Sequence, residues 1–278
     1  MIIACGEWGL RELEMEDHFR FCEKFGFNFM EIGIGGDEKG RLSLDMDKAQ
    51  VSTFLNMKNS YGIEAPYCML ENDFTFHDEE EHNKQVVSTI NALHLAKKLN
   101  TKIVRLFAGF TPADELNESI WQRLLSALND CQKICKELNL EIAVETHGKI
   151  VVKDNIFYHI QTVSTDRDCL KRLVKEMPEG IGFCYDPGNM RAVDPDDTRY
   201  GLDIINDRIN YCHLKDWKTK GDGWYPAAPG DDSLDYSALL PKINYNGPYA
   251  IEYEPTEDVE DGFRRSIDYL KRIGQVIE

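Results

Sequence analysis

The sequence predicts a (β/α)₈ barrel, with residues 1–278 forming a single domain. Eight short apolar, β-branched or aromatic runs occur along the 278 residues, and each is followed by a segment with helical spacing. The length also suits one such barrel, whose parallel strands need helical connections. A doubly wound open sheet has the same local pattern, but the segment CGEWGL at residues 5–10 lacks the glycine fingerprint that usually follows its first strand.

Each predicted element follows from a local pattern. The eight strands begin near Ile2, Phe27, Gly62, Lys102, Leu140, Gly180, Arg208 and Pro248. Helical spacing is clearest over 79–99, over 116–138 and from 263 to 277, where apolar residues recur every three or four positions. Two segments rich in glycine and charge, 37–41 and 218–232, are too short to divide the chain into domains.

The charge balance excludes several classes of partner. The chain has 49 acidic and 32 basic residues, a formal net charge of −17. This excess opposes binding to nucleic acids and to anionic membranes. No run of about 18 apolar residues is present, and the first residues lack the basic and apolar regions of a signal peptide. We therefore expect a cytoplasmic protein that binds neither nucleic acid nor membrane.

Charged residues interrupt four of the predicted strands where buried parallel strands should be apolar. The last four strands read EIAVETH, IGFCYDPGN, INYCHLKD and YAIEYEP, so that Glu145, Asp186, His213 and Glu252 lie near their carboxyl ends. Side chains alternate along a strand, and the large apolar neighbours suit the helix-covered outside. The four polar side chains are therefore expected to point into the barrel, at the end where barrel enzymes keep their active sites.

Three carboxylates and an imidazole in one place repel each other unless a cation holds them together. We therefore expect Glu145, Asp186, His213 and Glu252 to bind one divalent metal ion. Neighbouring strands lie about 4.8 Å apart, which lets the four side chains converge. Three oxygen ligands and one nitrogen favour Mn²⁺ or Mg²⁺, and Zn²⁺ or Co²⁺ also fit.

Four motifs carry a resemblance to a known family. They are VETHG at 144–148, YDPGN at 185–189, HLKD at 213–216 and IEYEP at 251–255. In this order they resemble the xylose isomerase-like barrels, in particular the sugar phosphate isomerase/epimerase group. The resemblance implies that the same four residues bind one divalent cation, commonly Mn²⁺, and that Glu145 and Glu252 are the catalytic acid and base.

The activity that the resemblance implies is a step of carbohydrate metabolism. A ketose or keto-polyol, either a sugar or a sugar phosphate, would be isomerised or epimerised by proton transfer through a metal-stabilised enediolate. Because the net charge repels a phosphorylated substrate, a neutral sugar or polyol is favoured.

Three further residues are candidates for substrate binding. His147 can donate to a substrate hydroxyl, or it can be a loop histidine. Asn189 stands where many epimerases of the group have a histidine. Lys215 has the same phase as His213 and can neutralise a developing oxyanion, or it can pair with Asp186 or Asp216.

Arg105 is the fourth candidate for substrate binding. It points inward on the fourth strand, where it can hold a hydroxyl or phosphate or form a buried ion pair with Glu31 or Glu145. Glu254 shares the phase of Glu252, and the choice of Glu252 as the metal ligand rests mainly on the resemblance.

Two other functions stay open. One is a metal-dependent dehydratase, lyase or hydrolase on the same barrel, and the other is a non-catalytic barrel that binds a polyol. Related DNA repair endonucleases hold a three-metal cluster with many more histidines, and only seven histidines occur here. Barrels of this group often pair, so a homo-oligomer is also open.

Overall fold

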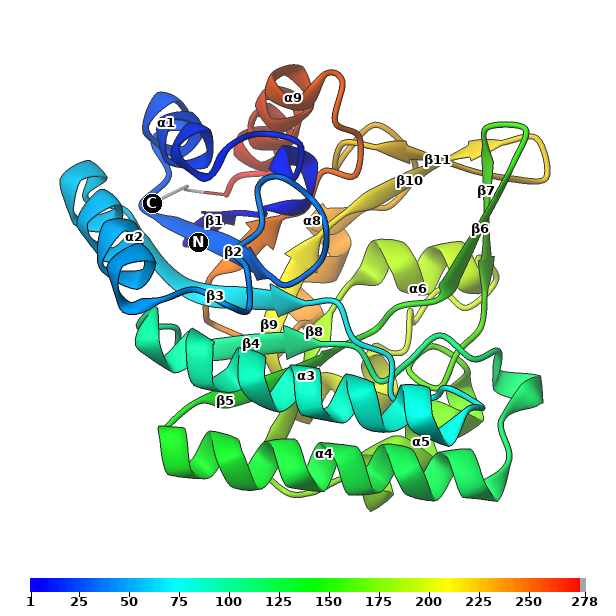
Figure 1. Ribbon diagram of the computed structural model, residues 1–278. Coiled ribbons are helices and arrows are strands. Elements are labelled where there is room, and N and C mark those ends of the chain that lie inside the picture. The colour runs from blue at the N-terminus through cyan, green and yellow to red at the C-terminus, as the bar shows by residue number, and fades with distance from the viewer. Residues whose placement is uncertain (276–278) are drawn as a thin grey trace.

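Eight parallel strands close into a barrel, as the sequence predicts (Figure 1). The computed structural model describes residues 1–275. The strands lie around the barrel in the order β1 (Ile3–Cys5), β2 (Phe29–Ile34), β3 (Glu64–Leu70), β4 (Ile103–Leu106), β5 (Glu141–Glu145), β8 (Ile181–Tyr185), β9 (Ile209–Leu214) and β12 (Tyr249–Ile251), and β12 pairs with β1. Each falls within one of the eight predicted runs.

Helices surround the barrel. They are α1 (Met15–Phe25), α2 (Lys48–Tyr61), α3 (Glu79–Lys98), α4 (Glu118–Leu138), α5 (Arg167–Glu176), α6 (Pro187–Val193), α7 (Leu202–Ile205), α8 (Tyr236–Leu239) and α9 (Val259–Arg272), with short 3₁₀ turns at Trp8–Leu10, Ala113–Glu115, Asn206–Arg208 and Leu240–Lys242. The predicted helices over 79–99, 116–138 and 263–277 correspond to α3, α4 and α9, although Ile277 lies outside the described residues.

Local sequence explains where the helices begin and end. The side chain of Asp47 accepts a hydrogen bond from the backbone N–H of Gln50 and so starts α2, and Asn117 does the same for α4 through Ile120. Gly62 ends α2 with φ +67°, a conformation that glycine adopts without strain. No helix within residues 1–275 has the length and apolar character that a membrane crossing requires.

Two hairpins that the sequence analysis did not predict lie beyond the carboxyl ends of the barrel strands (Figure 1). They are β6 (Lys149–Lys153) with β7 (Ile156–Ile160), and β10 (Asp216–Lys220) with β11 (Gly223–Ala227). They join as an antiparallel sheet in the order β10-β11-β7-β6. Asp154 and Asn155 both have positive φ, 52° and 58°, which is the signature of a tight two-residue hairpin turn.

The predicted inward and outward phases of the last four strands are confirmed. Ala143, Cys184, Tyr211 and Ala250 pack together inside the barrel. Their neighbours along the strands pack outward against the helices, in a separate core that includes Ile142, Phe183, Leu214 and Ile251. The same alternation carries the charged residues of the strand ends inward, toward the barrel mouth.

Candidate metal centre

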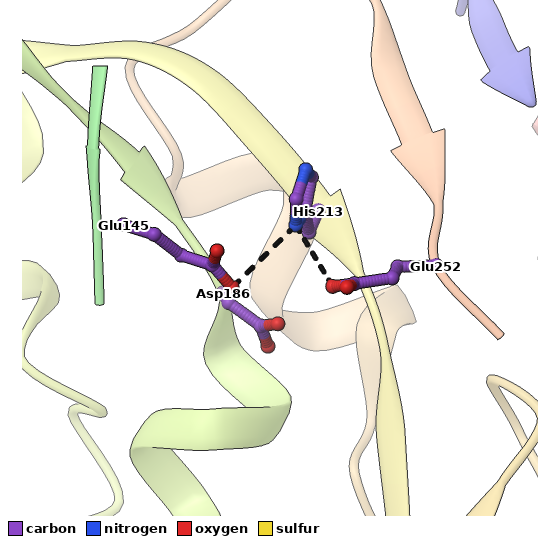
Figure 2. Close-up of side chains that lie close together, drawn as sticks. All are labelled: Glu145, Asp186, His213 and Glu252. Carbon is purple, nitrogen blue, oxygen red and sulfur yellow. Dashed lines mark ion pairs between the residues drawn. The ribbon is translucent and has the colours of Figure 1, made fainter. Parts of the chain in front are cut away.

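Four polar side chains meet at the carboxyl end of the barrel (Figure 2). Glu145 ends β5, Asp186 follows β8, His213 lies in β9 and Glu252 follows β12. One ligand atom from each lies within 4.8 Å of all the others. None of the four residues is more than 3% exposed. We call this group of four the tetrad.

The turn after β8 fixes Asp186. Its Oδ1 accepts a hydrogen bond from the backbone N–H of Asn189 at 2.9 Å and so starts α6, with Pro187 at the first helical position. A Cβ on Gly188 would lie 2.4 Å from the carbonyl oxygen of Lys215, so no larger residue fits there. The YDPGN motif therefore holds one oxygen of Asp186 in a helix cap and leaves the other free.

Two side chains hold Glu145. Arg105 Nε lies 3.0 Å from Glu145 Oε2, and Asn189 Nδ2 donates to Glu145 Oε1 at 3.2 Å. Burial raises the pKa of Glu145, but Arg105 and His213 together outweigh it, and the pKa lies below its usual value. Of the two ion pairs considered for Arg105, the structure forms the one with Glu145.

His213 is held from the far side of its ring. Its Nε2 lies 2.8 Å from Glu31 Oε1, and its Nδ1 lies 2.9 Å from Glu252 Oε2 and 3.6 Å from Glu145 Oε1. Burial opposes a charged imidazole, but Cys184 and the carboxylates of Glu31 and Glu252 outweigh it and raise the pKa well above its usual value. Nδ1 is thus the ring nitrogen that faces the carboxylates of Glu145 and Glu252.

The donor set fits a divalent cation. Asp186 Oδ2 is buried and has no hydrogen-bond partner within residues 1–275, whereas the buried His213 Nδ1 and Glu252 Oε2 make only ion-pair contacts. Burial, only partly opposed by Lys215, raises the pKa of Asp186 to about 8. Buried polar atoms without partners cost free energy, and oxygen and imidazole ligands at this spacing are what such a cation takes.

Lys215 lies beside the tetrad. Its Nζ is 2.6 Å from Glu254 Oε2 and 3.5 Å from Glu252 Oε2. Burial opposes the charged ammonium, but Glu252 and Glu254 outweigh it and raise the pKa of Lys215 above its usual range. The partner is therefore neither of the aspartates considered from the sequence, and Asp216 pairs with Arg191 instead.

His147 lies at the edge of this network. Its Nδ1 is 2.6 Å from the carbonyl oxygen of Gly148, and its ring packs against Phe107 and Phe110 at 5.0 and 5.6 Å between centroids. Burial lowers the pKa of His147 below its usual value. A neutral imidazole at this point keeps one nitrogen for hydrogen bonding.

Three contacts in and around the tetrad were not predicted. Glu31 was expected only as a partner for Arg105, but it accepts hydrogen bonds from Tyr211, at 2.5 Å, and from His213. Trp217 Nε1 donates to Asn189 Oδ1 at 3.1 Å. The inward phase of Glu31 was visible in the sequence, whereas the contact across the barrel depends on closure.

Comparison with known proteins agrees with this geometry. A model of the family described as xylose isomerase-like TIM barrel matches residues 19–273. The chain belongs to this family. It is 25% identical over 188 residues to the uncharacterized protein y4fM of Sinorhizobium fredii, a match that covers 65% of this chain and 56% of that protein. The chain thus spans little more than half the length of this relative.

Several solved structures share the fold. The IOLI protein with a bound zinc atom has a TM-score of 0.75 and 16% identity, over 98% of each chain. The 3-keto-D-glucoside 4-epimerase YcjR from E. coli has a TM-score of 0.72 and 15% identity, over 98% of this chain and 99% of that one. The probable 3-DHS dehydratase AsbF from Bacillus anthracis has the same values. At these identities the likeness shows the fold alone.

Proposed function

We propose that this protein is a divalent-metal-dependent isomerase or epimerase of a ketose or keto-polyol. The observation that carries the proposal is the buried tetrad, in which Glu145 and Glu252 approach His213 from two sides (Figure 2). Two carboxylates on either side of one centre suit proton transfer to and from a substrate held between them. The sugar epimerases among the structures of the same fold support the proposal.

Glu145, Asp186, His213 and Glu252 would hold the cation, with Mn²⁺ or Mg²⁺ preferred for three oxygens and one nitrogen. The cation would act as a Lewis acid that draws electron density from a carbonyl oxygen and so makes the neighbouring C–H bond more acidic. The protein's own groups would then move the proton.

Glu145 and Glu252 are both ionised at neutral pH, the state that a general base needs. The positive groups around them hold the pKa of each carboxyl below its usual value, for Glu252 against burial through Lys215 and His213. One glutamate would remove a proton from one face of the substrate and the other would return one. Return to the opposite face of the same carbon gives epimerisation, and return to the adjacent carbon gives isomerisation.

The candidate substrate contacts divide into two pairs. Arg105 and Asn189 both contact Glu145, so we assign them the task of orienting that carboxylate. Lys215 is a protonated donor beside Glu252 and would stabilise negative charge that develops on substrate oxygen. His147 would donate to a substrate hydroxyl from the edge of the mouth.

Lys215 also supports a second candidate function, that of a dehydratase. A protonated amine next to Glu252 can give its proton to a departing β-hydroxyl after the α-proton is removed. This reaction releases water and leaves a carbon–carbon double bond, whereas the product of epimerisation has the same molecular formula as the substrate.

The test is exchange of substrate protons with deuterated water. Protein loaded with Mn²⁺, Mg²⁺, Co²⁺ or Zn²⁺ is incubated with a panel of ketoses, and NMR follows deuterium at the carbons next to the carbonyl. We expect incorporation with the wild type. The Glu145→Gln and Glu252→Gln variants should lose roughly 10²- to 10⁴-fold in exchange rate.

Glu141→Gln is the matched control, because Glu141 lies exposed at the other end of β5. It should exchange at the wild-type rate. Loss of water with formation of a double bond would select the dehydratase. Absence of exchange and of water loss with every ketose and every metal would overturn both reactions.

A further inference from the structure

A cavity of ≈ 500 Å³ lies beside the tetrad. It is enclosed by the tips of the two hairpins, the loop that follows β12 and Arg11. Its lining includes Arg11, Phe157, Lys220, Tyr225, Glu254 and Glu257. Its volume is within the range of small-molecule sites.

One chain of contacts joins this cavity to Glu252. Glu254 lines the cavity, its Oε2 lies 2.6 Å from Lys215 Nζ, and this Nζ lies 3.5 Å from Glu252 Oε2. Trp8 Nε1 also donates to Glu254 Oε1 at 2.8 Å, which fixes the carboxylate on the cavity side. The cavity therefore ends one side chain away from a proposed catalytic glutamate.

A second chain of contacts joins the cavity to Glu145. The ring of Phe157 lies 5.5 Å from that of Trp217, whose Nε1 donates to Asn189, and Asn189 donates to Glu145. Lys215 therefore separates the cavity from Glu252, and Trp217 and Asn189 separate it from Glu145. A ligand that reacts at the tetrad would extend into this space if it were longer than a single sugar.

The cavity wall presents an aromatic surface with polar groups around it. Tyr225 is 46% exposed and is the one aromatic among the strongly exposed large apolar side chains of residues 1–275. Its ring lies 6.5 Å from that of Phe157, and Lys220 Nζ lies 4.7 Å from its centroid. An aromatic ring with an apolar body and a polar rim suits a sugar ring, which has C–H faces and hydroxyl edges.

The charges around the cavity favour a neutral ligand. Arg11 and Lys220 line the cavity together with Glu254 and Glu257, so cations and carboxylates balance. Both cations already donate, Arg11 to the carbonyl oxygens of Trp8 and Glu254 and Lys220 to that of Asn155. The two carboxylates offset the two cations, so the lining offers a phosphate no net positive charge.

We propose that this cavity is a subsite for a second, uncharged sugar ring, and that the substrate is a glycoside of a ketose rather than a free monosaccharide. The inference rests on the proposed function, since it names the substrate class of the same centre. The reacting ketose lies at the tetrad, and the attached ring packs on Tyr225.

The test compares ketoses that differ by one attached ring. The probes are D-fructose, lactulose and isomaltulose, and their binding to the Mn²⁺-loaded protein is measured by calorimetry. We expect at least one disaccharide to bind on the order of tenfold more tightly than D-fructose, because the added ring buries apolar surface on Tyr225. The Tyr225→Ala variant should bind that disaccharide no more tightly than D-fructose.

Two variants complete the test. Tyr225→Phe keeps the ring and should keep the preference, and Val151→Ala, at an exposed position of β6, should change neither affinity. Equal binding of all three sugars, or an equal loss for all of them in Tyr225→Ala, would overturn the subsite. Proton exchange with D-fructose then judges the proposed function separately, because that reaction does not need the second ring.

Discussion

The barrel interior has two layers of side chains that differ completely in chemistry. The layer toward the amino ends of the strands is small, aromatic or apolar, and consists of Ala4, Tyr67, Ala143, Cys184, Tyr211 and Ala250. The layer that reaches the carboxyl ends is charged, and includes Glu31, Arg105, Glu145, His213, Lys215 and Glu252. Both layers are buried, and β5 and β9 contribute side chains to both.

The difference between the two layers shows where the protein gives up stability for function. The apolar layer gains free energy from burial. The charged layer needs every charge to have a partner, because an unpaired buried charge is strongly destabilising. A barrel under selection for stability alone has no use for the second layer, so the charged layer indicates a site.

Breaking a buried pair in the charged layer should have the largest effect. Arg105→Met leaves Glu145 without its guanidinium partner, in a place where both side chains are at most 2% exposed. We expect the free energy of unfolding of the metal-free protein to fall by about 3–5 kcal/mol in urea denaturation.

The matched control for this variant is an exposed ion pair. On α4, Lys133 Nζ lies 3.0 Å from Asp130 Oδ1, and more than 40% of each side chain is exposed. Lys133→Met should change the free energy of unfolding by less than about 1 kcal/mol. Similar losses for Arg105→Met and Lys133→Met would contradict the distinction drawn between the charged layer and the surface.

The contact between the two layers should control metal affinity. Glu31 holds His213 Nε2 and accepts a hydrogen bond from Tyr211 of the apolar layer. Partners of this kind orient a metal-binding histidine. Glu31→Gln should weaken Mn²⁺ binding roughly 10- to 100-fold in calorimetry.

Glu71→Gln serves as the control for Glu31→Gln. Glu71 follows β3 at the same end of the barrel, but it is exposed and pairs with Arg41. Its replacement should leave Mn²⁺ affinity within about twofold, since the residue does not contact His213. If the Glu31→Gln and Glu71→Gln variants bound Mn²⁺ with equal affinity, a positioning role for Glu31 would be ruled out.

The two fully buried histidines, His18 and His213, differ in the direction in which their surroundings shift the pKa. Carboxylates surround His213, but His18 lies on the buried face of α1, where burial lowers its pKa to about 4 against the support of the Leu10 carbonyl. The unfolded chain binds a proton near pH 6.5, and the folded chain does so only near 4. Stability is therefore lost as pH falls through this window.

The expected size of this effect is on the order of 1–2 kcal/mol between pH 7 and pH 5. His18→Gln should reduce the pH dependence of the free energy of unfolding by that amount. His94→Gln, which alters an exposed histidine of α3, should not. The same pH dependence in His18→Gln and the wild type would show that His18 does not titrate in this window.

The sequence predicted the barrel, its strands and the convergence of the tetrad, because these depend on alternation along single strands. Ala143 and Glu145 share a phase on β5 whatever lies across the barrel. Contacts across the barrel were not predictable in the same way. Glu31 and His213 are 182 positions apart, and only closure of the sheet brings β2 and β9 face to face.

The hairpins were missed for a different reason. Lys149–Lys153 is bounded by lysines and mostly exposed, so it lacks the buried apolar run that marks the barrel strands. The Asp154–Asn155 turn was the available signal. Because these hairpins form much of the cavity wall beside the tetrad, the proposed sugar subsite could not be inferred from the sequence.

The most direct test of the central claim is titration of the metal-free protein with Mn²⁺ at pH 7.5, followed by calorimetry and thermal unfolding. We expect one bound ion per chain, and an increase of about 2.7 kcal/mol in the free energy of unfolding when free Mn²⁺ is a hundredfold above its dissociation constant. Asp186→Asn and His213→Asn should lose both effects. No binding and an unchanged unfolding temperature in the wild type, with Mn²⁺ and with each of Mg²⁺, Co²⁺ and Zn²⁺, would contradict the assignment of the tetrad as a metal centre.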